Sequence, residues 1–231
     1  MNWAAECIAI IPCFNEQANI VEVVSAARRF LPHVLVIDDG SVDRTTEVAR
    51  NAGAVVLKQE ANRGKGAALQ AGWRSARERG FKWALMMDGD GQHSPEDIPS
   101  FFQYAEATSA ALVVGNRMGD AARMPRVRRF VNRWMSRRLS RIAGRELPDS
   151  QCGFRLMNLE ALASLSVTTS RFEIESELLL AFISAGYQFG FIPIRVIYKD
   201  EQSKIHPLRD TLRWFRWWYS LRRTKNIQKH L

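Results

Sequence analysis

Cysteine is scarce in this chain. Among 231 residues there are three cysteines, Cys7, Cys13 and Cys152, and no two of them form a Cys-x-x-Cys pair. An odd number without such a pair argues against a disulfide framework or a zinc site, and a reducing compartment is the default. Cys7 and Cys13 lie in an apolar run, where a small buried hydrophobe is the expected role.

Long apolar runs are missing as well. No uncharged apolar run reaches the roughly 20 residues that span a bilayer, and the longest candidate, after Glu177, fits a buried helix better. The N-terminal apolar stretch lacks a basic flank and runs into polar residues, so we expect no signal peptide.

Acidic residues are outnumbered by basic ones. The chain has 33 Lys and Arg against 24 Asp and Glu, a formal net charge of +9. This excess favours anionic partners such as phosphorylated ligands, nucleic acid or an acidic membrane surface. No standard nucleic-acid motif is visible, so we expect no nucleic-acid partner. A basic nucleic-acid-binding module stays as the alternative of another class, and its binding would weaken steeply with salt.

Short apolar runs alternate with amphipathic segments in the first half. Strands are expected at 7–11, 34–37, 54–57, 83–87 and 111–114, and helices at 19–30, 43–51, 66–79 and 95–106. Asp43 and Ser94 are the expected N-caps of two helices, and Gly80 is the expected stop of a third. The alternation predicts an α/β fold with a mainly parallel sheet and helices on both faces.

Polar clusters follow three of these strands. They are Asn15-Glu16, Asp38-Asp39 and the stretch DGDGQH at 88–93. Ligands of parallel sheets bind beyond the carboxyl ends of the strands, so one shared site is the economical interpretation.

The last of these clusters has the chemistry of a metal site. In an extended chain, Asp88, Asp90 and Gln92 would face one side. Oxygen ligands of this kind suit a hard divalent ion such as Mg²⁺, which takes its remaining ligands from water and substrate phosphates. The alternative is a solvated turn whose aspartate caps the next helix.

Two segments of the second half mix arginines with aromatic residues. Residues 123–145 carry nine arginines and no acid, and 206–223 again combine arginine with tryptophan, phenylalanine and tyrosine. Such segments fit helices lying at a membrane interface. Solvated helix faces with ordinary core aromatics are the alternative.

An ordered set of motifs resembles the inverting family-2 glycosyltransferases of GT-A fold. The set is IPCFNE at 11–16, VIDDGS at 36–41, NRGKG at 62–66 and DGDGQH at 88–93. VGNR at 114–117 and DSQCGFR at 149–155 look like the subgroup that makes dolichyl- or polyprenyl-phosphate sugars, with which FEIE at 172–175 and Ser203-Lys204 are compatible. The resemblance covers about residues 7–205.

The resemblance implies one GT-A domain over 1–231, with a nucleotide-binding half at about 1–117 and an acceptor- and membrane-facing half at about 118–231. The residues that it implies for the nucleotide are Pro12, Phe14, Glu16, Ile37, Asp39, Lys65, Asp88, Gly89 and Asp90. Asp90, Gln92 and Asp88 would hold Mg²⁺ or Mn²⁺. Core packing is an equally weighted alternative for Ile37. For Lys65, which belongs to no Walker A loop, the alternative is a solvated lysine at a glycine-rich helix start.

On the acceptor side, the resemblance implies phosphate contacts from Arg117, Arg129 (or its neighbour Arg128) and Lys204. A phosphate monoester is mostly dianionic at neutral pH and attacks without a base, whereas a hydroxyl needs one. Asp149 is the best carboxylate for such a base, and with Asp90 it completes the candidate catalytic residues. The alternative for Asp149 is a structural role, in which it pairs with Arg155. His93 is expected to be structural.

The expected reaction moves a hexose, with mannose and glucose the leading candidates, from a GDP- or UDP-linked donor to a polyprenyl phosphate. We expect the protein in the cytoplasm, peripherally attached at the cytosolic membrane face. Two other enzymes are alternatives: a family-2 glycosyltransferase that acts on a hydroxyl of a saccharide, lipid or protein, and a sugar-nucleotide pyrophosphorylase. The usual glycine-rich N-terminal loop of the latter is not visible.

Overall fold

The computed structural model describes residues 1–119, 124–197 and 212–220. Within these residues, one sheet of seven strands runs in the order β3-β2-β1-β4-β6-β5-β7. The strands are β1 (Cys7–Cys13), β2 (Val34–Asp38), β3 (Val55–Lys58), β4 (Trp83–Met86), β5 (Leu112–Asn116), β6 (Arg155–Asn158) and β7 (Phe189–Pro193). Among them, β6 alone runs antiparallel to its neighbours β4 and β5. The expected mainly parallel sheet is thus confirmed.

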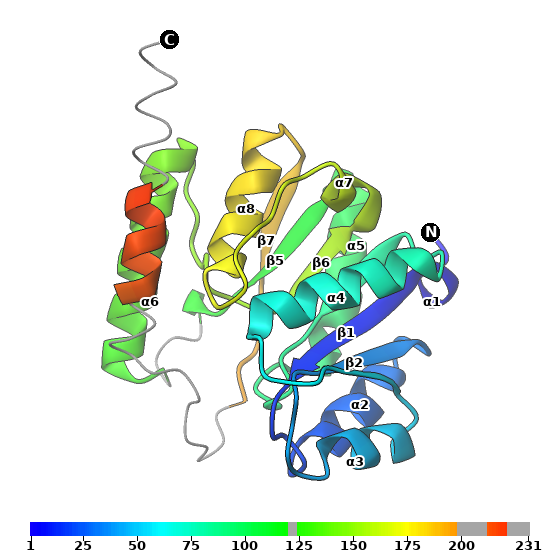
Figure 1. The fold of residues 1–231 in the computed structure, drawn as a ribbon. Coiled ribbons are helices and arrows are strands. Elements are labelled where there is room, and N and C mark those ends of the chain that lie inside the picture. Colours follow the sequence, from blue (N-terminus) through cyan, green and yellow to red (C-terminus); the bar gives the residue numbers. More distant parts are fainter. Residues whose placement is uncertain (120–123, 198–211, 221–231) are drawn as a thin grey trace.

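Helices flank this sheet. They are α1 (Trp3–Glu6), α2 (Ile20–Arg28), α3 (Thr45–Asn51), α4 (Lys65–Glu78), α5 (Ile98–Thr108), α6 (Arg126–Ala143), α7 (Leu159–Ala163) and α8 (Ile174–Ser184), with a 3-10 turn, η1 (Pro95–Asp97), leading into α5. Residues 212–220 are also helical. Figure 1 shows α4 and α8 lying over the same face of the sheet.

The core lies around the central strands. Every residue of β1 and of β2 is buried, which explains why both read as continuous apolar runs rather than alternating ones. α4 packs closely on them: a Cβ at Gly72 would lie 2.8 Å from Ile10 and 3.1 Å from Ile37. All three cysteines are buried thiols, and burial raises the pKa of Cys152 to about 12. Their expected role as small hydrophobes fits this burial.

Two expected helix caps differ in part from the structure. α3 begins at Thr45, so its N-cap position is Arg44 rather than Asp43. Asp43 still contributes, because its Oδ1 accepts from the Thr45 amide at 3.0 Å. Ser94 does hold the expected N-cap position, ahead of Pro95 in η1, but its side chain makes no cap bond. Gly80 does follow α4, with φ at +83°.

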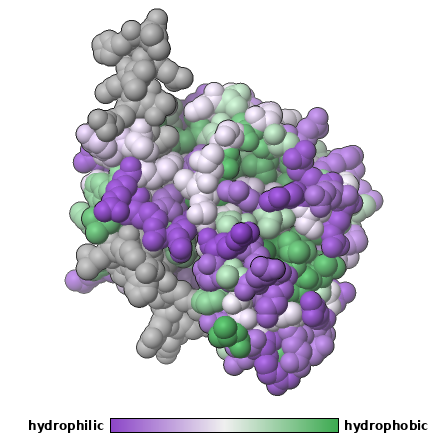
Figure 2. All heavy atoms as spheres, in the orientation of Figure 1, coloured by the Kyte–Doolittle hydropathy of each residue, from purple (hydrophilic) through white to green (hydrophobic). Residues whose placement is uncertain are grey.

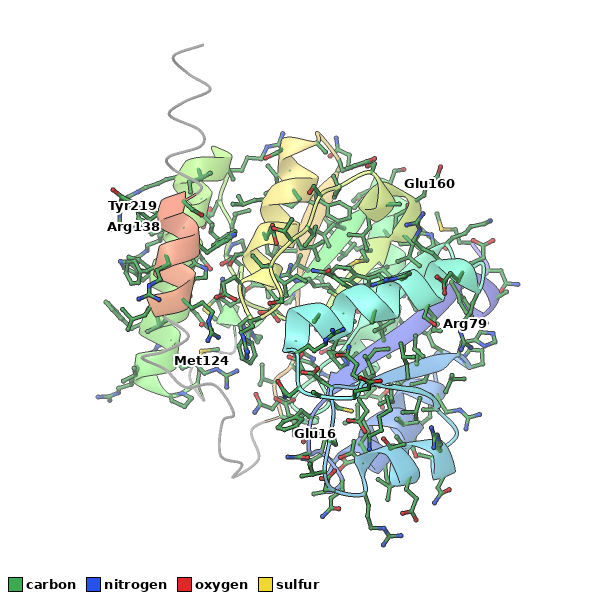
Figure 3. All side chains as sticks on the ribbon, viewed as in Figure 1. Glu16, Arg79, Met124, Arg138, Glu160 and Tyr219 are labelled. Carbon is green, nitrogen blue, oxygen red and sulfur yellow. The ribbon has the colours of Figure 1, made fainter. Side chains whose placement is uncertain are left out.

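Helix α6, in the first basic–aromatic segment, packs against residues 212–220, the described part of the second. Trp134 of α6 lies 5.6 Å from Trp214 and 4.8 Å from Phe215, between ring centroids. The Arg138 guanidinium lies over the rings of both Trp134 and Trp218, a cation–π arrangement. In Figure 3, the label Arg138 marks α6 and the label Tyr219 marks the 212–220 helix. None of the described helices is both long enough and apolar enough to cross a bilayer.

Candidate active site at the carboxyl ends of the strands

The loops after β1 and β2 are bonded to each other beyond the sheet. The Asn15 amide donates to Ser41 Oγ at 2.8 Å, and the Glu16 amide donates to Thr45 Oγ1 at 2.8 Å. In return, Asn15 Oδ1 accepts from the Val42 amide at 3.0 Å. Figure 3 labels Glu16 just beyond the end of β1. The polar residues after these strands therefore form one rim, as their positions in the sequence indicated.

Two adjacent aspartates shape this rim. Asp38 is fully buried, and its carboxylate accepts from the Ser41 amide and from the Thr46 hydroxyl. Asp39 accepts from the amides of Arg63 and Gly64, each at 2.8 Å. Burial raises the pKa of Asp39, an effect that the two amides oppose. Asp39 thus ties its own loop to the one that leads into α4.

The chain turns directly after β4, so the expected extended alternation of Asp88, Asp90 and Gln92 is wrong. Gly91 has φ at +71°, and Asp90 Oδ1 accepts from the Gln92 amide at 3.0 Å. This bond is an Asx turn, in which an aspartate side chain bonds the backbone two residues on. The turn lies against the end of β1, since a Cβ at Gly89 would be 3.1 Å from Cys13 Cβ.

His93 supports this turn. Its Nδ1 accepts from the Asp88 amide at 3.2 Å, and its ring stacks on Phe154 with centroids 5.0 Å apart. Burial lowers the pKa of His93, although the neighbouring charge of Asp88 opposes the shift. These contacts fit the structural role expected of this histidine.

Lys65, the first residue of α4, is held between two carboxylates. Its Nζ lies 2.5 Å from Asp88 Oδ1 and 2.5 Å from Glu175 Oε1. The side chain is 15% exposed, so the alternative of a solvated lysine is wrong. Burial lowers the pKa of Lys65, but Asp88 and Glu175 outweigh that effect and hold its pKa above the ordinary value.

The two acids of the turn are in different electrostatic positions. Burial raises the pKa of Asp88, but the charge and hydrogen bond of Lys65, together with the charges of His93 and Arg117, outweigh burial, and the pKa falls below its usual range. For Asp90, burial and the charge of Asp88 together raise the pKa. The positive charge of Lys65 therefore compensates Asp88 more than Asp90.

The residues of the turn fit a metal ion whose remaining ligands come from the substrate. Among the described residues, no three His, Cys, Asp or Glu side chains form a group that could hold a metal ion, so a cage made by the protein alone is absent from that part of the chain. Mg²⁺ commonly needs only one or two carboxylates and takes its other ligands from water and substrate phosphates. Asp88, Asp90 and the Gln92 amide oxygen match that donor set.

Asp149 pairs with Arg117, which corrects the expected partner Arg155. Arg117 donates from Nε to Asp149 Oδ2 at 2.8 Å and from Nη2 to Oδ1 at 2.9 Å. Asp149 is fully buried. Burial raises the pKa of Asp149, but Arg117 outweighs burial, and the net effect lowers it. A buried carboxylate tied to a guanidinium by two parallel bonds is a weak general base.

Arg155 instead organises backbone. It is fully buried, and it donates to the carbonyl oxygens of Cys152 at 2.7 Å, Ser150 at 2.9 Å and Glu175 at 2.6 Å. These bonds fix the 150–153 loop against the start of α8. The sequence analysis assigned no role to Glu175. The FEIE stretch at 172–175, which ends at this residue, was the one feature that could have indicated it.

The sequence model of the family described as Glycosyl transferase family 2 matches residues 8–165. The chain belongs to this family. It is an enzyme, a glycosyltransferase, and the expected family and GT-A fold are confirmed.

Two curated relatives are named for transfer to lipid phosphates. The chain is 30% identical over 214 residues to a UDP-N-acetylglucosamine–dolichyl-phosphate N-acetylglucosaminyltransferase of Methanococcus voltae, with 83% of this chain and 85% of that protein covered. It is 29% identical over 201 residues to a polyprenol monophosphomannose synthase of Mycolicibacterium smegmatis, with 81% and 76% covered.

A solved structure shares the fold. Glucosyl-3-phosphoglycerate synthase from Mycobacterium tuberculosis, crystallised with Mn²⁺, UDP and phosphoglyceric acid, superposes with a TM-score of 0.69. The two chains are 21% identical, and the superposition covers 87% of this chain and 73% of that one.

The remaining predicted residues of this family-2 glycosyltransferase fall into three groups. Arg128 and Arg129 lie in the first turn of α6, and Arg128 Nη1 reaches Gln92 Oε1 at 3.5 Å, so α6 adjoins the acidic turn at 88–92. Ile37 is fully buried in β2 beneath α4, the placement of a core residue, and we leave it out of the nucleotide site proposed below. Lys204 lies outside the described residues.

Proposed function

We propose that the protein transfers a hexosyl group from a nucleotide sugar to a polyprenyl phosphate, with inversion and with the help of Mg²⁺ or Mn²⁺. In this proposal residues 1–117 bind the donor and residues 118–231 face the acceptor and the membrane. The observation that carries it is the position of the acidic turn at 88–92. It joins the rim beyond β1 and β2 through Gly89 and meets arginine-rich α6 through Arg128.

The donor would lie along the rim. Pro12 lies near the end of β1, and Phe14 and Glu16 lie in the loop that follows it. Asp39 and Gly89 follow β2 and β4, the strands on either side of β1. We propose that they hold the nucleoside, with Asp39 accepting a hydrogen bond from the base or ribose. The diphosphate then reaches the turn, where Asp88, Asp90 and Gln92 would bind the metal and Lys65 adds positive charge. When bound, a divalent ion would neutralise the charge growing on the leaving diphosphate.

Asp90 has a defined part in this chemistry. As an ionised ligand beside Asp88 it would keep the metal and the diphosphate at the turn, so that the anomeric carbon faces α6. The acceptor oxygen then forms the new bond to this carbon while the bond to the diphosphate breaks, and the nucleoside diphosphate leaves with the bonding electrons. Attack from the side opposite the leaving group inverts the anomeric centre.

The acceptor proposal rests on charge. Arg117 and Arg129 (or Arg128), together with Lys204, would bind the lipid phosphate, since a guanidinium can bind two phosphate oxygens at once. The bonds between Asp149 and Arg117 support a phosphate acceptor over a hydroxyl, because Asp149 then orients an arginine and no base is needed. Both curated relatives are named for lipid-phosphate acceptors, but they carry different sugars.

Membrane attachment is proposed through α6 and the 212–220 helix. Val127 and Phe130 are 71% and 69% exposed, between arginines of the same helix, and Leu212 and Tyr219 are exposed on the other helix. Figure 2 shows apolar atoms beside strongly hydrophilic ones on the side where α6 lies. Apolar side chains flanked by arginines suit the interface of an anionic bilayer. We propose the cytosolic face as the place of attachment.

A transfer assay tests the proposal. Labelled GDP-mannose, UDP-glucose and UDP-N-acetylglucosamine are offered with and without polyprenyl phosphate, in detergent with Mg²⁺, and label entering the organic phase is counted. Lipid-linked label that EDTA abolishes is the expected result, and the productive donor names the sugar. Consumption of a donor without labelled lipid would refute the acceptor. EDTA-resistant labelling of the lipid would refute the metal.

A further inference from the structure

One buried cluster at the edge of the site has a member without an assigned role. Lys65 Nζ contacts both Asp88 Oδ1 and Glu175 Oε1 at 2.5 Å. These residues come from three elements: the first turn of α4, the loop after β4 and the first turn of α8. The Glu175 side chain is 7% exposed, so water screens its charge only weakly.

The backbone around this cluster fixes its geometry. A Cβ at Gly153 would lie 2.6 Å from Asp88 Oδ2 and 2.8 Å from Lys65 Nζ, so the 150–153 loop closes over the ion pair. The Glu175 carbonyl accepts from Arg155 Nη1 at 2.6 Å. Because Arg155 also binds Cys152 and Ser150 carbonyls, it locks the loop and α8 together, and the Glu175 carboxylate is held beside the lysine.

Counting charges shows what Glu175 adds. Without it, the Lys65 ammonium would neutralise Asp88 and leave a single uncompensated acid, Asp90. With it, three carboxylates share one ammonium, and the cluster carries a net charge of −2. Two buried arginines lie nearby: Arg117 is paired with Asp149, and Arg155, which donates to three carbonyl oxygens, interacts electrostatically with Glu175 from outside this group of four. The group of four itself carries an excess of negative charge, which favours a divalent cation.

We propose that Glu175 is a positioning residue of the metal site: by sharing the Lys65 ammonium with Asp88, it keeps Asp88 negative enough to bind a divalent cation. This inference rests on the proposed function, which places the metal at Asp88 and Asp90. It gives Glu175 no contact with metal or sugar, so the effect passes through Lys65. Partners of metal ligands commonly change metal affinity on the order of 10- to 100-fold when they are removed.

Charge-balanced variants test the proposal. The net charge of the cluster is −1 in Glu175→Gln, −3 in Lys65→Gln and again −2 in the double variant. Mn²⁺ is titrated into each protein alone, then with GDP and with UDP, and free Mn²⁺ is followed by electron paramagnetic resonance. We expect a Kd about 10-fold higher in Glu175→Gln, a lower Kd in Lys65→Gln without nucleotide, and a Kd near that of the wild type in the double variant.

Kinetics adds a second readout. Glu175→Gln should raise the KM for the metal more than it lowers kcat at saturating metal. The matched control is Glu160→Gln, an exposed acid on α7 that Figure 3 labels away from the cluster, and it should leave the Kd for Mn²⁺ unchanged. Circular dichroism confirms that each variant is folded.

The outcomes separate this inference from the proposed function. A Glu175→Gln protein that binds Mn²⁺ like the wild type overturns the inference, whatever its activity. So does a Lys65→Gln protein with unchanged or weaker Mn²⁺ binding, a result that does not depend on whether Glu175→Gln folds. If the wild type itself binds no Mn²⁺ under any condition, the metal site of the proposed function fails, and this inference fails with it.

Discussion

The two halves of the sheet hold their buried charges in opposite ways. Beyond β2, the buried charges are the acids Asp38 and Asp39, and backbone amides donate to both. Around β5 and β6, two buried arginines, Arg117 and Arg155, donate to the carboxylate of Asp149 and to three carbonyls. The first half thus presents amides to acids, and the second presents oxygen acceptors to guanidinium groups.

This contrast matches the two substrates that we propose. A metal-bound diphosphate needs an excess of negative charge to hold the cation, and the turn after β4 lies on the acidic side. A lipid phosphate needs fixed positive charge, and Arg117 and α6 lie on the basic side. The Arg128–Gln92 contact is where the two sides meet. Five predictions test the contrast, from the largest expected effect to the smallest.

Asp149→Asn should break the basic side by leaving Arg117 buried without its counter-charge. We expect a loss of about 3–5 kcal/mol in the free energy of unfolding, measured by urea denaturation. The matched control is Glu96→Gln, which removes the acid of the exposed pair with Arg29 and should cost less than about 1 kcal/mol. Equal losses in the two variants would contradict the structural role of Asp149.

The Asp149–Arg117 pair also predicts how the stability of the protein depends on pH. The pKa of Asp149 is lowered in the folded state, so the ionised carboxylate contributes stability above its unfolded pKa of about 3.9. This contribution is complete at neutral pH and is lost as pH falls below about 4 through the folded pKa. The stability of Asp149→Asn should therefore fall less steeply than that of the wild type over this range.

Asp90→Asn should disable the acidic side. The amide keeps the shape of the side chain but lacks the charge that would hold the metal, so we expect transfer to fall on the order of 100-fold or more. The label-transfer assay measures the rate at saturating donor. Turnover like that of the wild type would refute the metal assignment of Asp90.

Arg129→Ala should weaken the use of acceptor while leaving the donor side intact. A charged hydrogen bond to phosphate is worth about 1.5–3 kcal/mol, so we expect kcat/KM for polyprenyl phosphate to fall about 10-fold or more. Arg137→Ala, an exposed arginine two turns further along α6, is the control. A fall of the same size in both variants would reduce the role of Arg129 to general surface charge.

Phe130→Ser should have the smallest effect, on attachment alone. Removing one exposed apolar side chain from α6 should weaken binding to vesicles of anionic phospholipid about threefold to tenfold. Val42→Ser, which changes another exposed apolar side chain in the loop between β2 and α3, should leave vesicle binding unchanged in a flotation assay. Identical flotation of both variants would argue against α6 as the membrane face.

The mainly parallel character of the sheet, the helices of the first half and the family could be predicted from the sequence alone. Apolar runs fully buried in β1 and β2 and amphipathic periods such as that of α2 are local properties, and they survive folding with shifts of one or two residues at their ends. The motif set likewise lies within short stretches of chain. The predicted roles of Asp39, Arg117 and Arg129 in binding still await their experiments.

The tertiary structure decided which charges meet. The structural alternative for Asp149 named Arg155, six residues away, as its partner, yet the partner is Arg117, 32 residues away and directly after β5. Likewise, Lys65 and Glu175 are 110 residues apart in the chain, and the local sequence around either residue does not predict their contact. The antiparallel insertion of β6 between β4 and β5 brings these segments together. A buried ionised group is stable only with a partner, and the strand order determines which partner is within reach.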